Sequence, residues 1–125
     1  MAEELVRIGA QYGLTVFQVN DARLAYLDMD HDSFVDRSFV CGDEIDVGFY
    51  EDPEKRTISV FHEIGHRVTE ESAHEVSTEG PDFKVAPELI AWLLGIREAA
   101  LHGIHFSADT INWALEQALT YRGYQ

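Results

Sequence analysis

The stretch that decides the fold of this chain is DPEKRTISVFHEIGHRV, residues 52–68, near the middle of its 125 residues. Asp52 is a good helix N-cap and Pro53 suits the first helical position, because that position needs no backbone N–H. Glu54 then places a negative charge near the positive end of the helix dipole. The sequence therefore predicts a helix that begins at Pro53 and runs to about Val68.

One face of this predicted helix is apolar. Ile58, Phe61 and Ile64 recur at helical spacing, so one face of the helix should be buried. Gly65 extends the stripe, although a glycine inside a helix costs about 1 kcal/mol relative to alanine. We expect this glycine to permit a close approach by another element of the fold.

The same helix carries the motif His62-Glu63-Ile64-Gly65-His66. Two histidines four residues apart project from one face of a helix, so both imidazoles can reach one metal ion. Glu63 lies beside this pair, where it can take a proton from metal-bound water. The alternative is a mixed helix whose two histidines face solvent. The clean helix start and the apolar flanks favour a zinc site.

Zinc held by two histidines needs a third protein ligand and an open position for water. An ordered carboxylate on a second packed helix is better placed than one in a loop, so we favour Glu88. Glu98, about 80° away around the same predicted helix, is the second choice. Other downstream residues remain open as ligands: Glu70, Glu71, His74, Glu75, Glu79, His102 and His105.

The first 50 residues predict one helix and several strands. Residues 2–11 have a helix-forming composition, with Leu5 and Ile8 on one face and Gly13 as a stop. Residues 23–27 fit either a strand or a helical turn. Alternating β-branched and aromatic residues predict three strands, at residues 14–19, 33–41 and 44–50.

Two shorter features of this half are given structural interpretations. Residues 28–32, DMDHD, place carboxylates as an EF-hand loop does, but the glycine and the closing glutamate of that loop are missing. We therefore predict a solvated turn. Cys41 is expected to be a buried small hydrophobic residue.

Two more helices are predicted after a polar, acidic loop at residues 72–83. Pro87 opens the first, residues 88–101, and Ser107 caps the second, residues 108–121. The second helix is expected to face inward with four residues: Ile111, Leu115, Ala118 and Leu119. Trp92 and Trp113 fall on apolar helix faces and are predicted to lie in the core.

Composition limits the class of protein. With 46% apolar residues the chain is globular, and its length fits a single domain. One cysteine forms no internal disulfide, and the N-terminus carries Glu3 and Glu4 where a signal peptide needs basic residues. The net charge of −14 argues against nucleic acids and anionic membranes as partners. A cytoplasmic protein with an acidic surface is expected, or an acidic mimic of DNA.

Residues 57–68 and 87–95 together resemble the zincin metallopeptidases, specifically the gluzincin branch. In that branch a second helix carries the glutamate ligand, often with a small residue three positions on, and Glu88-Leu89-Ile90-Ala91 fits this form. Small ImmA/IrrE-type proteases and phage- or plasmid-borne zincin-like domains are the nearest in size. Thr69 and the acidic residues after it do not supply the H-E-x-x-H-x-x-G-x-x-H extension, so the chain does not resemble a metzincin.

The resemblance implies a minimal zincin-like α+β fold over residues 1–125: a short mixed or antiparallel sheet packed on the motif helix, with two further C-terminal helices. The strand at residues 44–50 would be the sheet edge that pairs with extended substrate. His62, His66 and Glu88 would hold Zn²⁺, and Glu63 would act as general base. The group that stabilises the oxyanion is left open among four residues: His102, His105, Tyr121 and Tyr124.

The predicted function is a zinc-dependent peptidase that hydrolyses a peptide bond in an intracellular protein, using a zinc-activated water with Glu63 as base. The alternative is a non-catalytic zincin-like binding or inhibitor protein, of which an acidic DNA mimic is one version. The two differ in what they require of Glu63, since only a peptidase needs its carboxylate.

Overall fold

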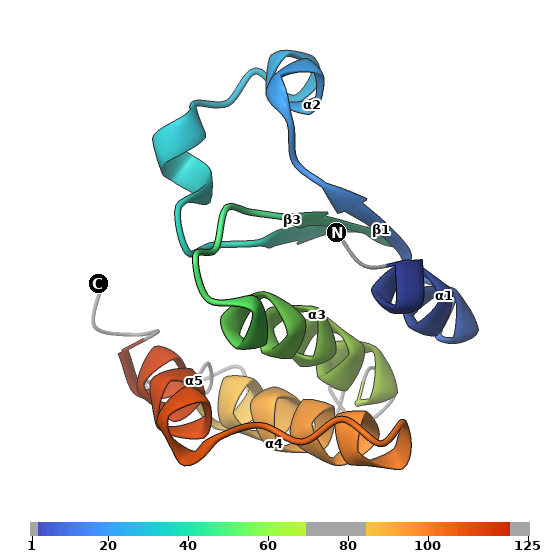
Figure 1. Ribbon diagram of the computed structural model, residues 1–125, viewed down its shortest axis with the longest axis vertical. Coiled ribbons are helices and arrows are strands. Elements are labelled where there is room, and N and C mark those ends of the chain that lie inside the picture. The colour runs from blue at the N-terminus through green and yellow to red at the C-terminus, as the bar shows by residue number, and fades with distance from the viewer. Residues whose placement is uncertain (1–2, 70–84, 121–125) are drawn as a thin grey trace. The chain divides into compact units, whose positions relative to one another are not determined.

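The computed structural model describes residues 3–69 and 85–120, with the side chains of 85, 86 and 120 excepted, and over these residues the predicted α+β class is confirmed (Figure 1). The chain divides into two compact units, Met1–Val60 and Phe61–Gln125, and each is described by itself. The elements are α1 (Glu3–Gln11), β1 (Thr15–Gln18), α2 (Asp21–Leu27), the 3-10 helix η1 (His31–Phe34), β2 (Phe39–Cys41), β3 (Glu44–Val47), α3 (Pro53–Val68), α4 (Val85–Leu101) and α5 (Ala108–Thr120).

The first unit contains a three-stranded mixed sheet with the order β1-β3-β2. Ile45 of β3 lies opposite Val16 of the parallel β1 and opposite Val40 of the antiparallel β2. Of the two predicted forms, mixed or antiparallel, the sheet is the mixed one. The expectation that strand 44–50 forms its edge is wrong, because β3 is paired on both sides. Ile45 and Val47 are accordingly fully buried.

The second predicted strand is shorter than expected. Residues 31–34 form η1, and only Phe39–Cys41 pair with β3. The prediction that Cys41 is buried is also wrong: β2 is an edge strand, and all three of its residues are exposed.

An ion pair explains why β3 departs from simple apolar and polar alternation. Asp46 is only 4% exposed, and its Oδ1 accepts a 2.6 Å hydrogen bond from Nε of Arg23. The same guanidinium donates to Glu44 at 2.9 Å. Hydrogen bonds to Asp46 and Glu44 raise the pKa of Arg23 above its usual value. Arg23 belongs to α2, which settles the ambiguous segment 23–27 as helical, with Asn20 as its N-cap.

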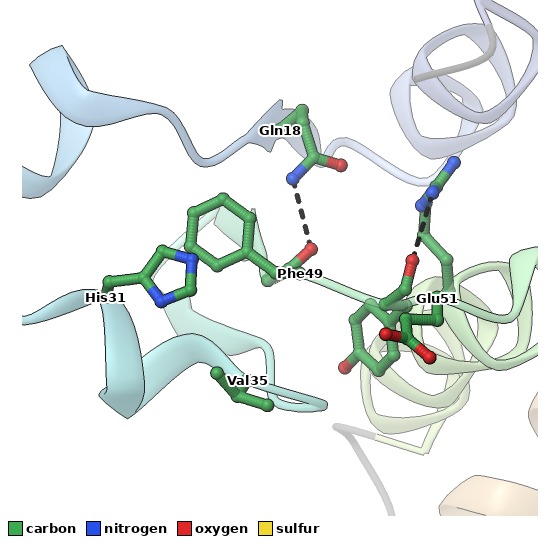
Figure 2. A pocket seen from close by; sticks show the side chains of 8 residues that line it. Gln18, His31, Val35, Phe49 and Glu51 are labelled. Carbon is green, nitrogen blue, oxygen red and sulfur yellow. Dashed lines mark hydrogen bonds between the residues drawn. The ribbon is translucent and has the colours of Figure 1, made fainter.

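The first unit also has an open cavity of about 320 Å³ (Figure 2). On one side the imidazole of His31 stacks on the ring of Phe49, with centroids 4.2 Å apart. Gln18 borders it as well and donates from Nε2 to the carbonyl of Gly48 at 3.0 Å. The predicted turn at residues 28–32 therefore supplies an aromatic contact, and His31 belongs to no group of metal ligands within the described ranges.

The start of α3 is as predicted. The backbone N–H of Glu54 donates to Oδ1 of Asp52 at 2.9 Å, so Asp52 caps the helix that Pro53 opens. Ile58, Phe61 and Ile64 are fully buried, which confirms the apolar stripe.

The second unit is built on a close crossing between the end of α3 and α4. A Cβ added at Gly65 would fall on the carbonyl oxygen of Ala91 and lie 3.0 Å from the backbone nitrogen of Gly95. A Cβ at Gly95 would fall on the carbonyl oxygen of Phe61 and lie 3.1 Å from the nitrogen of His62. The two helix backbones therefore touch, which confirms the expected role of Gly65.

Helix α4 starts earlier than predicted, at Val85, so Pro87 lies inside the first turn, where its missing N–H has no intrahelical partner to lose. It ends at Leu101, and Gly103 follows with a φ of 76° in the left-handed region; the N–H of Ile104 donates to the carbonyl of Ala99 at 2.9 Å. This stop had a sequence signal, the glycine directly after the apolar run.

Helix α5 packs against α4, and the two lie side by side in Figure 1. Ser107 caps α5 as predicted, since its Oγ accepts a hydrogen bond from the N–H of Thr110 at 3.3 Å. Small residues, Ala114 and Ala118, form its buried face, whereas Leu119 is 60% exposed and its predicted inward position is wrong.

None of the helices in the described part of the chain is both long enough and apolar enough to cross a membrane.

The close crossing predicts the effect of Gly65→Ala. In an unobstructed helix this change would stabilise by about 1 kcal/mol. Here the new Cβ meets backbone rather than a flexible side chain, so we expect a loss of about 1–3 kcal/mol in the free energy of unfolding. Thermal and urea unfolding measure it.

Asn112→Ala is the control, because Asn112 is exposed in the middle of α5 and the change improves helix propensity without a clash. If Gly65→Ala stabilised the protein as much as the control does, the close approach of α3 and α4 at Gly65 would be contradicted.

Candidate metal centre

Three side chains of the second unit converge on one point. Nε2 of His62 lies 2.8 Å from Oε2 of Glu88, and Nε2 of His66 lies 3.0 Å from Oε1 of the same carboxylate. The two Nε2 atoms are 3.0 Å from each other. His62 and His66 come from successive turns of α3, and Glu88 comes from the first turn of α4. They form the only group of possible metal ligands within residues 3–69 and 85–120.

The helix crossing explains this convergence. Glu88 precedes Ala91 by about one turn of α4, so it lies on the α4 face that touches α3 at Gly65. His62 and His66 flank Gly65 on α3. Because the helix backbones are in contact, the short side chains of a glutamate and two histidines can span the space between them.

Protons alone cannot satisfy the three contacts. If both Nε2 atoms carry a proton, His62 and His66 each donate to Glu88, but the two N–H groups then face each other at 3.0 Å. If one is deprotonated, its contact with the carboxylate has no hydrogen. A single cation at the centre would be bound by both Nε2 atoms and the carboxylate at once, so the donor set fits a metal ion.

The dimensions and the ligand types fit zinc. Adjacent ligands of a tetrahedral zinc with bonds of about 2.0–2.1 Å are about 3.3 Å apart, and the distances here are 2.8–3.0 Å. Two imidazoles and one carboxylate are a known catalytic zinc set that leaves a fourth position open. The three side chains need to move apart by only a few tenths of an ångström.

Even without a bound ion, the neighbouring side chains shift the pKa values of Glu88 and His66. Burial raises the pKa of Glu88, but hydrogen bonds with His62 and His66 outweigh burial and lower it to about 2. Burial lowers the pKa of His66, yet the hydrogen bond with Glu88 and the charges of Glu63 and Glu88 raise it overall. Glu88 is therefore a carboxylate at neutral pH, as a metal ligand must be.

Glu63 lies beside the cluster and is 8% exposed. Its Oε1 is 3.3 Å from Nδ1 of His62, on the side of that ring opposite the converging nitrogen. Its Oε2 is buried and has no hydrogen-bond partner among the residues that the structure describes. Burial raises the pKa of this carboxyl, the charges of His62 and His66 oppose the rise, and the charge of Glu88 adds to it.

The structure separates the other candidate ligands. Glu98 is buried on α4 near Arg97, with 3.6 Å between Oε2 and Nε, and it is not part of the ligand group. His102 packs its ring 6.2 Å from that of Phe61, and His105 is exposed; neither belongs to the group. The remaining candidate ligands lie outside the described residues: Glu70, Glu71, His74, Glu75 and Glu79. Two of the candidates for oxyanion stabilisation, Tyr121 and Tyr124, lie outside them as well.

Trp92 was predicted only to lie in the core, but it also contacts one of the candidate ligands. Trp92 is 4% exposed, so burial is confirmed, but its indole stacks on the imidazole of His62 with centroids 3.9 Å apart. Trp113 is half-buried and meets Trp92 edge-on. A signal was present, because Trp92 follows Glu88 by four residues and so shares its face of a helix.

No protein-family model, curated protein or solved structure matches this chain. The likeness to gluzincins rests on the motif residues and stays a prediction.

Metal analysis tests the ligand set. We expect protein purified without a histidine tag to bind one zinc ion per chain by equilibrium dialysis. Glu88→Gln should weaken binding about 10–100-fold or more, because it removes the only anionic ligand of the group.

Glu98→Gln is the matched control, since it makes the same change to a buried glutamate of the same helix that lies outside the group. A larger loss of zinc with Glu98→Gln than with Glu88→Gln would move the third ligand to Glu98.

Proposed function

We propose that this protein is a zinc-dependent peptidase of the gluzincin type. The observation that supports the proposal best is the convergence of two imidazole nitrogens and one carboxylate. Beside them lies the buried carboxylate of Glu63, whose Oε2 has no hydrogen-bond partner among the described residues. Two neutral imidazoles and one carboxylate would leave a bound dication with a net positive charge, which suits an ion that must act as an electrophile.

Zinc, when bound, lowers the pKa of a coordinated water towards neutrality and polarises a carbonyl group. His62, His66 and Glu88 would hold the ion. Glu63 is the proton carrier, since its Oε2 has no donor among the described residues. The raised pKa of Glu63 brings it closer to the working pH, where a general base is most effective. It accepts a proton at a carboxylate oxygen and later gives it to the leaving amine.

A peptide bond in an intracellular protein is the proposed substrate, and this part of the proposal comes from the gluzincin resemblance. The acidic character of the chain, with a net charge of −14, disfavours a nucleic-acid substrate. The rival function is a zincin-like binding protein that keeps the metal but does not cleave.

Glu63→Gln separates the two functions. The amide keeps the size of the side chain but cannot accept the proton. We expect this variant to bind zinc as the wild type does and to lose about 10²–10⁴-fold in cleavage rate. The assay uses zinc-loaded protein with denatured casein and with a library of internally quenched peptides.

Glu98→Gln serves again as the control and should cleave at the wild-type rate. Cleavage by Glu63→Gln at the wild-type rate would contradict the proposed base. Stoichiometric zinc with no cleavage of any substrate by the wild type would instead favour the binding protein.

A further inference from the structure

The imidazole of His62 is held on three sides. Its face lies flat on the indole of Trp92, with ring centroids 3.9 Å apart and planes only 2° from parallel. Its Nε2 faces Glu88 at 2.8 Å, and its Nδ1 faces Glu63 at 3.3 Å. The indole fixes the plane of the ring, and the two carboxylates fix its rotation within that plane.

Trp92 is itself held firmly. It is 4% exposed, and the ring of Trp113 from α5 meets it edge-on at 6.0 Å and 81°. This T-shaped arrangement is favourable for two aromatic rings. A chain of contacts therefore runs from α5 through Trp113 and Trp92 to His62 on α3.

Among the residues that the structure describes, no indole stacks on the second histidine, His66. The side chain of His66 is 34% exposed, against 14% for His62, and its ring lies tilted by 55° to that of His62. The two histidines of one motif are thus held differently, and the difference comes from a residue on another helix.

We propose that Trp92 is a positioning residue of the metal centre, which stacks on His62 so that Nε2 points at the shared ligand position before any ion binds. The inference rests on the proposed zinc site and adds what orients it. Helix α4 then supplies both a ligand, Glu88, and the support for a ligand of α3.

Two physical effects carry this role. A ring that is already oriented loses less conformational freedom when it binds a metal ion, so the ion binds more tightly. In addition, an imidazole that donates electrons to a dication becomes electron-poor, and the face of an indole attracts such a group. Residues that support metal ligands in this way typically change metal affinity about 10–100-fold when they are replaced.

The test compares three variants. Trp92→Leu removes the aromatic face, and we expect zinc affinity, measured by competition with a chromophoric chelator, to fall at least about tenfold. Trp92→Phe keeps an aromatic face and should restore most of that affinity. Phe61→Leu is the matched control: Phe61 is fully buried and adjacent to His62 in sequence, but its described ring contact is with His102.

Two spectroscopic measurements separate positioning from general packing. In the metal-free wild type, the indole ring current should shift the carbon-bound protons of the His62 ring upfield, with assignment by their loss in His62→Gln. This measurement needs no Trp92 variant to fold. The absorption spectrum of the cobalt-loaded protein should change in Trp92→Leu and remain close to that of the wild type in Trp92→Phe and Phe61→Leu.

Equal zinc affinity in Trp92→Leu and the wild type would overturn the proposal, as would an equal loss in Phe61→Leu or His62 protons without the upfield shift. Wild-type protein that binds zinc but cleaves no peptide would refute the peptidase and leave the role of Trp92 standing. Wild-type protein that binds no zinc would overturn both.

Discussion

The contact between the backbones of α3 and α4 is the constraint on which the proposed metal centre depends. At Gly65 and Gly95 the two helices have no room for a Cβ atom. This approach places Glu88 level with His62 and His66, so that one carboxylate reaches both imidazoles. A pair of helices separated by ordinary side chains would keep the same three residues too far apart for a shared ion. The glycines thus cost helix stability and make the site possible.

The site is also costly in electrostatic terms. It gathers two imidazoles and two carboxylates in a largely buried place, and burial opposes the charged forms of Glu63, His66 and Glu88. Their contacts cannot all be satisfied by hydrogen bonds, which is expensive inside a protein. Such an arrangement is typical of a functional site, since a metal ion at the centre would offset the cost. The stack of His62 on Trp92 would also favour metal binding, because it orients the imidazole before an ion arrives.

Helix α3 and the three candidate ligands could be predicted from sequence, because the patterns that indicate them are local. The cap at Asp52 and Pro53 and the apolar stripe of α3 determine a helix, and the motif spacing puts both histidines on one face. Glu88 was favoured because its helix could pack on α3. The failures have one cause, since they depend on which strands and helices become neighbours. The burial of Asp46 depends on Arg23, and neither the central place of β3 nor the exposure of Cys41 follows from a pattern within one strand. The stack of Trp92 on His62 likewise joins two helices.

X-ray absorption at the zinc edge tests the central claim most directly, because it reports the ligands of the ion itself. The geometry predicts a first shell of nitrogen and oxygen atoms at about 2.0–2.1 Å, with the outer-shell scattering of two imidazole rings and no sulfur. Glu88→Gln should alter the oxygen contribution and leave both imidazoles in place. A spectrum with a sulfur ligand, with no imidazole, or with a shell of water oxygens alone would contradict a site built by His62, His66 and Glu88.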